Sequence, residues 1–268
     1  MLLEVAIEAA RTGGSHAQSN SSRRTEVIRN YAHDVKLALD VECQALIEKV
    51  IQGHFPEHSI LGEEDETSVN GTKLGENKSA EAAPGSSYEW IVDPIDGTVN
   101  FSHGYPCWCC SIAVRKGTEV LAAAVYAPDM DALYAATVDR PATCNGKPID
   151  VSERKTLAES LVMTGIDKKL IPGVESLTFF KKISFACQKT RVMGSAALDL
   201  CWVAEGRADG YFEGSIYLWD IAAAGLIVKQ AGGAGEIIAL REEPNQMSYI
   251  GSNGHVQEEL KSLIGLGD

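Results

Sequence analysis

The spacing of apolar and polar positions changes character along the chain. In the first part, the pattern predicts helices at residues 1–12, 23–33 and 40–51, with a polar stretch at 13–22 between the first two. Short apolar runs bounded by turn residues then predict strands, at 59–62, 88–92, 107–115, 119–126 and 133–138. Because the later strands follow one another across short turns, we expect a mostly antiparallel sheet.

The second part of the chain alternates strands with helices. Predicted strands lie at 160–164, 191–193, 210–213, 236–240 and 248–251, and predicted helices at 176–188, 195–205, 220–231 and 255–264. This alternation is typical of an α/β arrangement. We therefore expect an N-terminal α+β domain at 1–141 and a C-terminal α/β domain at 142–268.

The net charge of the chain and the length of its apolar runs disfavour nucleic acids and membranes as binding partners. The chain has 268 residues and a formal net charge of −13 at pH 7, which disfavours nucleic acid and anionic membranes. Apolar runs such as 120–127 have eight residues, far fewer than the roughly 18 that a membrane span needs. The seven cysteines, together with an N-terminus that lacks the pattern of a secretory signal, favour reduced thiols in the cytoplasm.

The segment Asp93-Pro94-Ile95-Asp96-Gly97-Thr98 carries the clearest chemical signal. Its two carboxylates follow the apolar run Trp90–Val92, and they repel each other unless a cation lies between them. Carboxylate oxygens suit Mg²⁺, and Gly97 permits a close backbone approach to a phosphate. The alternative is a simple turn, since Asp, Pro and Gly are common turn residues.

Two further segments carry acids at predicted element ends. Gly62-Glu63-Glu64 follows a predicted strand, where it is either a solvated acidic turn or a source of metal ligands, with Glu63 the better candidate. Asp220 precedes a predicted helix with small residues at 222–225, where it either caps the helix or joins a metal cluster. The small residues would let this helix lie close to another backbone.

Together these segments, with Gly194-Ser195-Ala196-Ala197 and Gly232-Gly233, resemble the inositol monophosphatase family in order and separation. The resemblance implies the layered αβαβα sandwich of that family and a homodimer. It implies Mg²⁺-dependent hydrolysis of a small-molecule phosphate monoester, with two to three ions and inhibition by lithium. Metal ions would also offset the repulsion between a phosphate substrate and this acidic chain.

The resemblance also implies the roles of individual acids. Glu63, Asp93 and the backbone oxygen of Ile95 would hold one metal, and Asp93, Asp96 and Asp220 a second. A third, weaker Mg²⁺ would sit near Glu63 through waters. The implied catalytic residues are Glu63, Asp93 and Thr98, of which Thr98 and Glu63 would orient and deprotonate the attacking water.

The implied substrate contacts come from both halves of the chain: Gly97, Thr98, Gly194, Ser195, Ala196 and Glu213. Glu213 matches the position at which members of the family bind ring hydroxyls, so it favours myo-inositol 1-phosphate as substrate. Other possibilities are a phosphatase for histidinol phosphate or another sugar phosphate, and a catalytically inactive regulatory or binding protein. The intact acids argue against an inactive protein.

The chain departs from the family pattern in two places. Lys36 and Leu37 stand where Val and Thr are usual. Lys36 either reaches the acidic cluster and competes with the third metal or faces solvent. The segment 65–87 is rich in Glu, Gly, Ser, Asn and Ala and predicts a long loop. The resemblance implies that this region lies near the site entrance, where it would act as a mobile lid.

Overall fold

The computed structural model describes residues 1–30, 35–66, 68–69, 72–73, 88–166, 175–241 and 244–265. Its α-helices are α1 (Leu2–Ser19), α2 (Ala38–His54), α3 (Thr98–His103), α4 (Glu175–Ala186), α5 (Ala196–Ala204), α6 (Leu218–Gln230) and α7 (Gln257–Ile264). Short 3-10 turns occupy η1 (Ser21–Arg23), η2 (Glu63–Glu66), η3 (Pro128–Met130) and η4 (Leu157–Glu159). No helix in the described ranges is long and apolar enough to cross a membrane.

The first sheet has seven strands in the order β11-β10-β9-β8-β7-β6-β3. The strands are β3 (Ser59–Gly62), β6 (Tyr88–Asp96), β7 (Cys109–Lys116), β8 (Glu119–Ala127), β9 (Ala132–Thr137), β10 (Arg140–Cys144) and β11 (Lys147–Pro148). Strand β3 pairs with β6 in parallel, and the other pairs are antiparallel. The prediction of a mostly antiparallel sheet is confirmed.

The second sheet has five strands in the order β13-β12-β14-β16-β15. The strands are β12 (Leu161–Thr164), β13 (Lys189–Arg191), β14 (Gly210–Tyr217), β15 (Ala234–Leu240) and β16 (Gln246–Ser252). Strand β12 is parallel to β13 and β14, whereas β14, β16 and β15 are antiparallel. Two small hairpins pair β1 (Val27–Asn30) with β2 (Val35–Leu37), and β4 (Ser68–Val69) with β5 (Thr72–Lys73).

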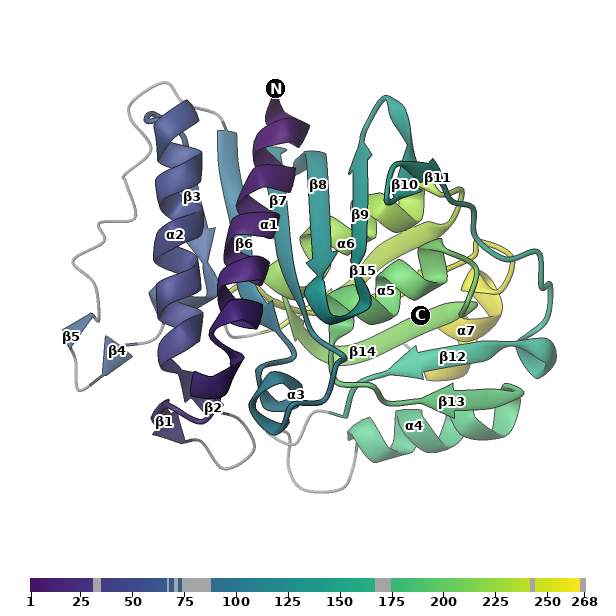
Figure 1. The fold of residues 1–268 in the computed structure, drawn as a ribbon. Coiled ribbons are helices and arrows are strands. Elements are labelled where there is room, and N and C mark those ends of the chain that lie inside the picture. Colours follow the sequence, from purple (N-terminus) through teal and green to yellow (C-terminus); the bar gives the residue numbers. More distant parts are fainter. Residues whose placement is uncertain are drawn as a thin grey trace.

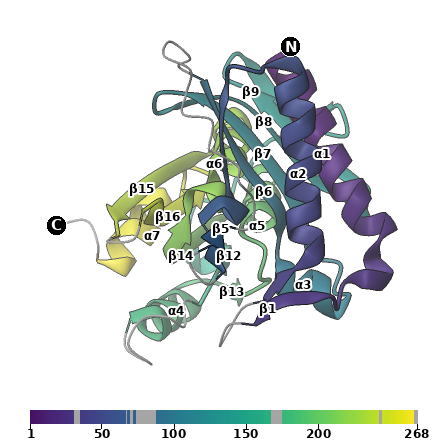
Figure 2. The ribbon, with the colours of Figure 1, turned by 90° about the vertical axis from the view of Figure 1, so that its left-hand side faces the viewer.

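The two sheets and the helices form five layers, seen from the side in Figure 2. Helices α1 and α2 cover the outer face of the first sheet, α5 and α6 fill the space between the sheets, and α4 and α7 cover the second sheet (Figure 1). This is the predicted αβαβα sandwich.

Burial on both faces explains the continuous apolar run before Asp93. Side chains alternate between the two faces of a strand, so Trp90 and Val92 pack under α1 and α2 while Ile91 packs toward α5 and α6. A strand covered on both faces has no solvated side and therefore carries no polar alternation. Strand β6 therefore places Asp93 and Asp96 in the interior of the protein.

The predicted helix at 23–33 is wrong. Helix α1 continues through the polar stretch to Ser19, and the chain then forms η1 and β1. A Cβ on Gly13 would lie 2.6 Å from Ile47 Cδ1, and one on Gly14 would lie 2.8 Å from Tyr126 Cδ1. These glycines therefore let α1 lie close to α2 and the sheet, and tertiary packing outweighs their low helix propensity.

Several boundaries differ from the prediction. The short helix α3 and strands β10 and β11 were not predicted, and the second strand of the second part, predicted at 191–193, lies two residues earlier as β13. The first sheet continues through β10 and β11, past residue 141, so the change of sheet falls between Pro148 and Leu161. The division into two domains stays a prediction. Most of the predicted loop at 65–87 lies outside the described residues.

Candidate active site

A β-bulge in β6 turns both acids of the Asp93–Asp96 segment to one side. Residues three apart on a regular strand point to opposite faces. Here Asp93 pairs with Ser111 and Asp96 with Cys109, so three steps along β6 match two along β7. The extra residue lies in the bulge with Pro94, which has no N–H for the ladder. The segment is therefore a bulged strand end rather than a simple turn.

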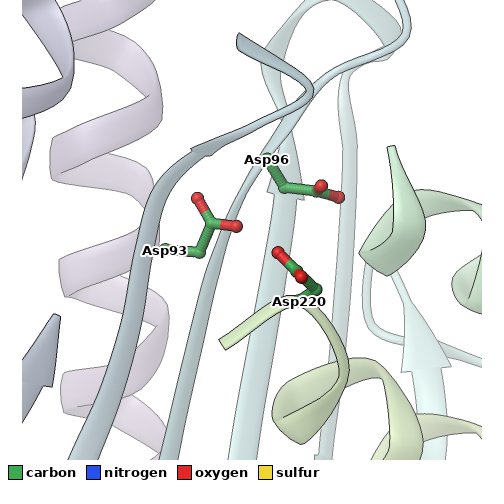
Figure 3. A group of neighbouring side chains, drawn as sticks. All are labelled: Asp93, Asp96 and Asp220. Atoms are coloured by element: carbon green, nitrogen blue, oxygen red, sulfur yellow. The ribbon is translucent and has the colours of Figure 1, made fainter. Parts of the chain in front are cut away.

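Helix α6 brings the third acid of the cluster. Asp220 lies in its first turn, and its Oδ2 accepts the N–H of Tyr217 at 2.9 Å. Asp220 thus caps its helix and also reaches the cluster. In Figure 3, Asp93, Asp96 and Asp220 point toward one another. One oxygen from each lies within 4.8 Å of the others.

The cluster has the chemistry of a divalent-cation site. Burial raises the pKa values of Asp93 and Asp220 well above the usual range, and repulsion between the carboxylates adds to this. Buried like charges require protons or cations. Opposite oxygen ligands of Mg²⁺ lie about 4 Å apart, close to the span of this cluster. The residues present therefore fit a bound metal ion.

Glu63 joins the cluster from the neighbouring strand. Strand β3 runs parallel to β6 with Gly62 beside Val92. Glu63 and Asp93, the next residue of each strand segment, therefore lie side by side at the same edge of the sheet. The side chains of Glu63 and Asp93 share a hydrogen bond. Burial, followed by repulsion from Glu64, raises the pKa of Glu63 well above its usual value. Glu63 thus reaches the cluster that the sequence indicated.

A side-chain clamp from α2 holds this acidic segment. Gln44 Nε2 donates to Asp65 at 3.0 Å and to Glu48 at 2.9 Å, while Gln44 Oε1 accepts the N–H of Glu64 at 3.0 Å. The Gly62 N–H donates to Asp65 Oδ2 at 3.0 Å. The sequence analysis missed this clamp, because a glutamine on a helix carries no chemical signal of its own.

Lys36 does not face solvent. Its side chain is 4% exposed and forms an ion pair with Glu64, whose side chain is 9% exposed. Lys36 therefore reaches Glu64, which adjoins the proposed ligand Glu63, and the solvent-facing alternative is wrong. Competition with a third metal stays a prediction. Leu37 beside it is fully buried.

The first turn of α5 holds Asp96 in place. Ser195 Oγ donates to Asp96 Oδ2 at 2.7 Å, the Ala197 N–H donates to the same oxygen at 2.8 Å, and the Ala196 N–H donates to Oδ1 at 3.2 Å. Burial raises the pKa of Asp96, and these hydrogen bonds act in the opposite direction. Ser195 and Ala196, predicted to contact substrate, therefore contact a predicted metal ligand in this structure.

The turn after β6 contacts the second half of the chain. Gly97 has φ of 91°, and a Cβ there would lie 3.1 Å from the Gly194 carbonyl oxygen. Asn100 Nδ2 donates to the Met193 carbonyl oxygen at 2.8 Å. Thr98 Oγ1 donates to the Ile95 carbonyl oxygen at 3.0 Å. The structure thus brings the predicted residues Gly97, Thr98, Ile95 and Gly194 into one region.

Glu213 lies on β14 at the other side of this region. Tyr211 Oη donates to its Oε2 at 2.5 Å. A Cβ on Gly165 would lie 2.2 Å from the Glu213 carboxyl group, so the missing side chain at Gly165 makes room for it. The negative charge of Glu213 contributes to the raised pKa of Asp220, which places it near the cluster.

Asp199 on α5 is a buried acid that the sequence analysis missed. Its side chain is 2% exposed, and its Oδ1 accepts no hydrogen bond from the described residues. Burial raises its pKa well above the usual range, followed by repulsion from Asp96 and Glu213. An acid within the otherwise apolar run Ala196–Ala204 was the available signal.

Comparisons with known proteins agree with this geometry. The model of the inositol monophosphatase family matches residues 1–264. Inositol monophosphatase 1 of Solanum lycopersicum is 34% identical over 234 residues, which cover 86% of this chain and 82% of that protein. Fructose-1,6-bisphosphatase/inositol-1-monophosphatase of Aquifex aeolicus is 34% identical over 92% of this chain and 89% of its own length. Nus factor SuhB of Vibrio cholerae is 35% identical, with coverages of 86% and 83%.

Solved structures give the same result for the fold. The inositol monophosphatase of Anabaena superposes with a TM-score of 0.80 at 32% identity, covering 98% of this chain and 94% of that one. The Thermotoga maritima IMPase superposes with a TM-score of 0.79 at 29% identity, with coverages of 98% and 96%. The chain therefore belongs to the inositol monophosphatase family and is a phosphatase.

Proposed function

We propose that the protein hydrolyses a phosphate monoester in a Mg²⁺-dependent reaction, with myo-inositol 1-phosphate as the favoured substrate. The observation that carries the proposal is the convergence of Glu63, Asp93, Asp96 and Asp220 from three distant segments on one cluster, in which Asp93 and Asp96 are buried. Acids that repel one another in a protein interior have a clear use as metal ligands.

The acids divide into two ligand sets around a shared member. Glu63, Asp93 and the carbonyl oxygen of Ile95 would hold one ion, and Asp93, Asp96 and Asp220 the other. Asp93 suits the shared position, because its side chain hydrogen-bonds to both Glu63 and Asp220. Bound Mg²⁺ would neutralise the phosphate, activate water and stabilise the leaving oxygen.

Thr98 and Glu63 are proposed to orient the attacking water and accept its proton. The Thr98 hydroxyl already donates to Ile95, which leaves its oxygen lone pairs to accept a hydrogen bond from that water. Glu63 lies beside the cluster, directly after the end of the neighbouring parallel strand β3. The backbone N–H groups of Gly97 and Thr98 are proposed to bind phosphate oxygens, since Gly97 has no side chain to block their approach.

The proposed substrate specificity rests on Glu213. A carboxylate accepts hydrogen bonds from two neighbouring hydroxyl groups, and Tyr211 and the space at Gly165 fix its position. Gly194, Ser195 and Ala196 are proposed to lie along the same side of the substrate. The names of the tomato and Anabaena relatives support inositol monophosphate as substrate, and the Aquifex name adds fructose 1,6-bisphosphate as a competitor to test.

A panel of phosphate esters tests the proposal. Myo-inositol 1-phosphate, histidinol phosphate, fructose 1,6-bisphosphate and p-nitrophenyl phosphate are offered to the enzyme with Mg²⁺ and with EDTA. We expect the highest kcat/KM for myo-inositol 1-phosphate and no turnover in EDTA. Turnover that persists in EDTA, or a clear preference for another ester, would overturn the metal or the substrate assignment respectively.

Glu213→Gln supplies the matched variant for the substrate assignment. It should raise KM for myo-inositol 1-phosphate by roughly tenfold, because a neutral amide is a weaker acceptor for two hydroxyl groups. Turnover of p-nitrophenyl phosphate, which has no ring hydroxyls, should change little. Equal losses on both esters would show that Glu213 acts on the reaction rather than on the sugar ring.

We further propose a lithium-sensitive homodimer in the cytoplasm. The resemblance to the family supports the dimer and the lithium effect, and the seven free cysteines support a reducing compartment. Sedimentation equilibrium measures the mass of the particle, and a Li⁺ titration of phosphate release measures the inhibition. A monomer, or activity unchanged by millimolar Li⁺, would contradict the corresponding statement.

A further inference from the structure

The Lys36 ammonium group is the feature of this site that its proposed chemistry leaves unexplained. Strand β2 carries Lys36 into the protein, where its side chain is 4% exposed and paired with Glu64. Burial of a charge is unfavourable unless a partner compensates it. A buried lysine beside metal-binding acids therefore suggests a role in the electrostatics of the site.

Lys36 compensates an acid next to a proposed metal ligand. Glu64 adjoins Glu63, and repulsion from Glu64 contributes to the raised pKa of Glu63. The ammonium thus places a fixed positive charge on the Glu64 side of the cluster. Any divalent ion approaching Glu63 from that side meets this charge, and Glu64 is already engaged as its partner.

The neighbouring side chains offer little to a further ion on this side. Leu37 is fully buried, and its apolar side chain supplies no oxygen. Asp40, the next buried acid, accepts the N–H of Leu37 at 2.7 Å with Oδ2 and so caps the start of α2. Repulsion from Asp40 also contributes to the raised pKa of Glu63, so this side of the site holds one helix-capping carboxylate and one ammonium group.

We propose that Lys36 is a permanent counter-cation of the active site, so that the site binds two divalent ions and excludes a third beside Glu63. The inference rests on the proposed metal-dependent function and fixes its metal count. In this protein, the Lys36 ammonium group supplies positive charge that a third metal ion from solution would otherwise supply. Removal of Lys36 should free the Glu64 carboxylate to attract one more ion.

Equilibrium dialysis against Mn²⁺ in saturating inorganic phosphate tests the metal count directly. Wild type should bind two ions per chain, Lys36→Met three, and Lys36→Met combined with Glu64→Gln two again. Lys36→Arg, which keeps the charge, should stay at two. Three ions on the wild-type chain, or two on the Lys36→Met variant, would overturn the inference while leaving the proposed function in place.

Thermal unfolding gives a second readout that does not depend on activity. In EDTA, Lys36→Met should lower Tm by roughly 10 °C, because it leaves the Glu64 charge buried without this partner. The rise in Tm on adding Mg²⁺ should be larger for Lys36→Met than for wild type. For the double variant, that rise should be no larger than for wild type. Equal Mg²⁺ responses in all forms would contradict the inference.

The two proposals fail in different ways. A wild-type chain that binds no Mn²⁺ would overturn the proposed function, and the counter-cation role with it. A wild-type chain that binds two ions and loses them on Asp93→Asn supports both. If Lys36→Met does not fold, the Mn²⁺ count of the wild-type chain still tests the inference, since three bound ions would overturn it.

Discussion

Asp93→Asn should stabilise the metal-free protein while removing its activity. The change is nearly isosteric, and an asparagine keeps the oxygen that accepts the Ile95 N–H at 3.1 Å. In the metal-free site, the Asp93 carboxyl group must take up a proton to donate a hydrogen bond to Glu63 or Asp220. The NH₂ group of an asparagine donates to both without such a proton. The variant thus keeps the contacts of the site and loses one negative charge.

The magnitude follows from the spacing of the carboxylates. Two ionised groups with oxygens 4.8 Å apart repel by about 3 kcal/mol at an effective dielectric constant near 20. Raised pKa values let protons relieve part of this repulsion, so we expect a gain of about 1–3 kcal/mol in the free energy of unfolding. For a chain of this size, that corresponds to a rise in Tm of roughly 3–8 °C in EDTA.

Mg²⁺ should reverse the order of stability. An ion at 100 times its Kd stabilises wild type by about 2.7 kcal/mol, and the variant loses most of that gain. Its kcat should fall by at least about two orders of magnitude, because the lost charge is shared by two proposed metals. Scanning calorimetry in EDTA and in Mg²⁺, with phosphate release measured on the same samples, follows both effects.

Asp96→Asn is the matched control, because it removes one charge from the same cluster. Its Oδ2 accepts hydrogen bonds from Ser195 and Ala197, and an NH₂ group in that position accepts neither. Asp96→Asn should therefore lower Tm in EDTA, whereas Asp93→Asn raises it. The reasoning is refuted if Asp93→Asn is the less stable of the two in EDTA, or if it keeps near-normal activity.

Three further predictions follow from the same contacts. In EDTA, Tm should fall as pH rises above about 4, because unfolded Asp and Glu ionise near 3.8 and 4.5 while the buried cluster retains its protons. Mg²⁺ should remove that slope, and a stability that rises with pH in EDTA would contradict the raised pKa values. Gly165→Ala should displace Glu213 and raise the KM for myo-inositol 1-phosphate several-fold, with little change in Tm. Gly53→Ala, where a Cβ meets nothing within 4 Å, should leave KM unchanged, and equal effects of the two changes would contradict this. Gln44→Ala should lower Mn²⁺ affinity roughly tenfold in a dialysis titration, since Gln44 holds the backbone of Glu64; an unaltered affinity would show that the clamp is dispensable.

The sequence predicts the acids of the site because each of them follows a local signal. Asp93 comes directly after the apolar run Trp90–Val92 of a strand buried on both faces, where an acid is unfavourable without a cation. Asp220 comes at a helix start with small residues behind it. Local patterns of this kind depend on a few neighbouring residues, so they are visible without knowledge of the tertiary structure.

Features that depend on two distant segments could not be predicted in the same way. The bulge that turns Asp93 and Asp96 to one side is defined by their pairing with β7. Gly13 and Gly14 fall in the polar stretch predicted between two helices, and the close packing that keeps them in α1 involves the distant residues Ile47 and Tyr126. The ion pair of Lys36 was one of two open alternatives, since its burial depends on how β2 packs.

The site has two sides: Asp96 and Asp220 are held by helices of the middle layer, and the Lys36–Glu64 ion pair lies on the other side. Asp96 accepts N–H groups from the first turn of α5, and Asp220 accepts the N–H that precedes α6, so both acids cap helices of the middle layer. The positive ends of these helices offset part of the negative charge. Lys36 and Glu64 lie outside that layer and take no part in its capping. On the proposed counter-cation role, a change at this pair alters the number of bound ions while the contacts of the middle layer stay intact.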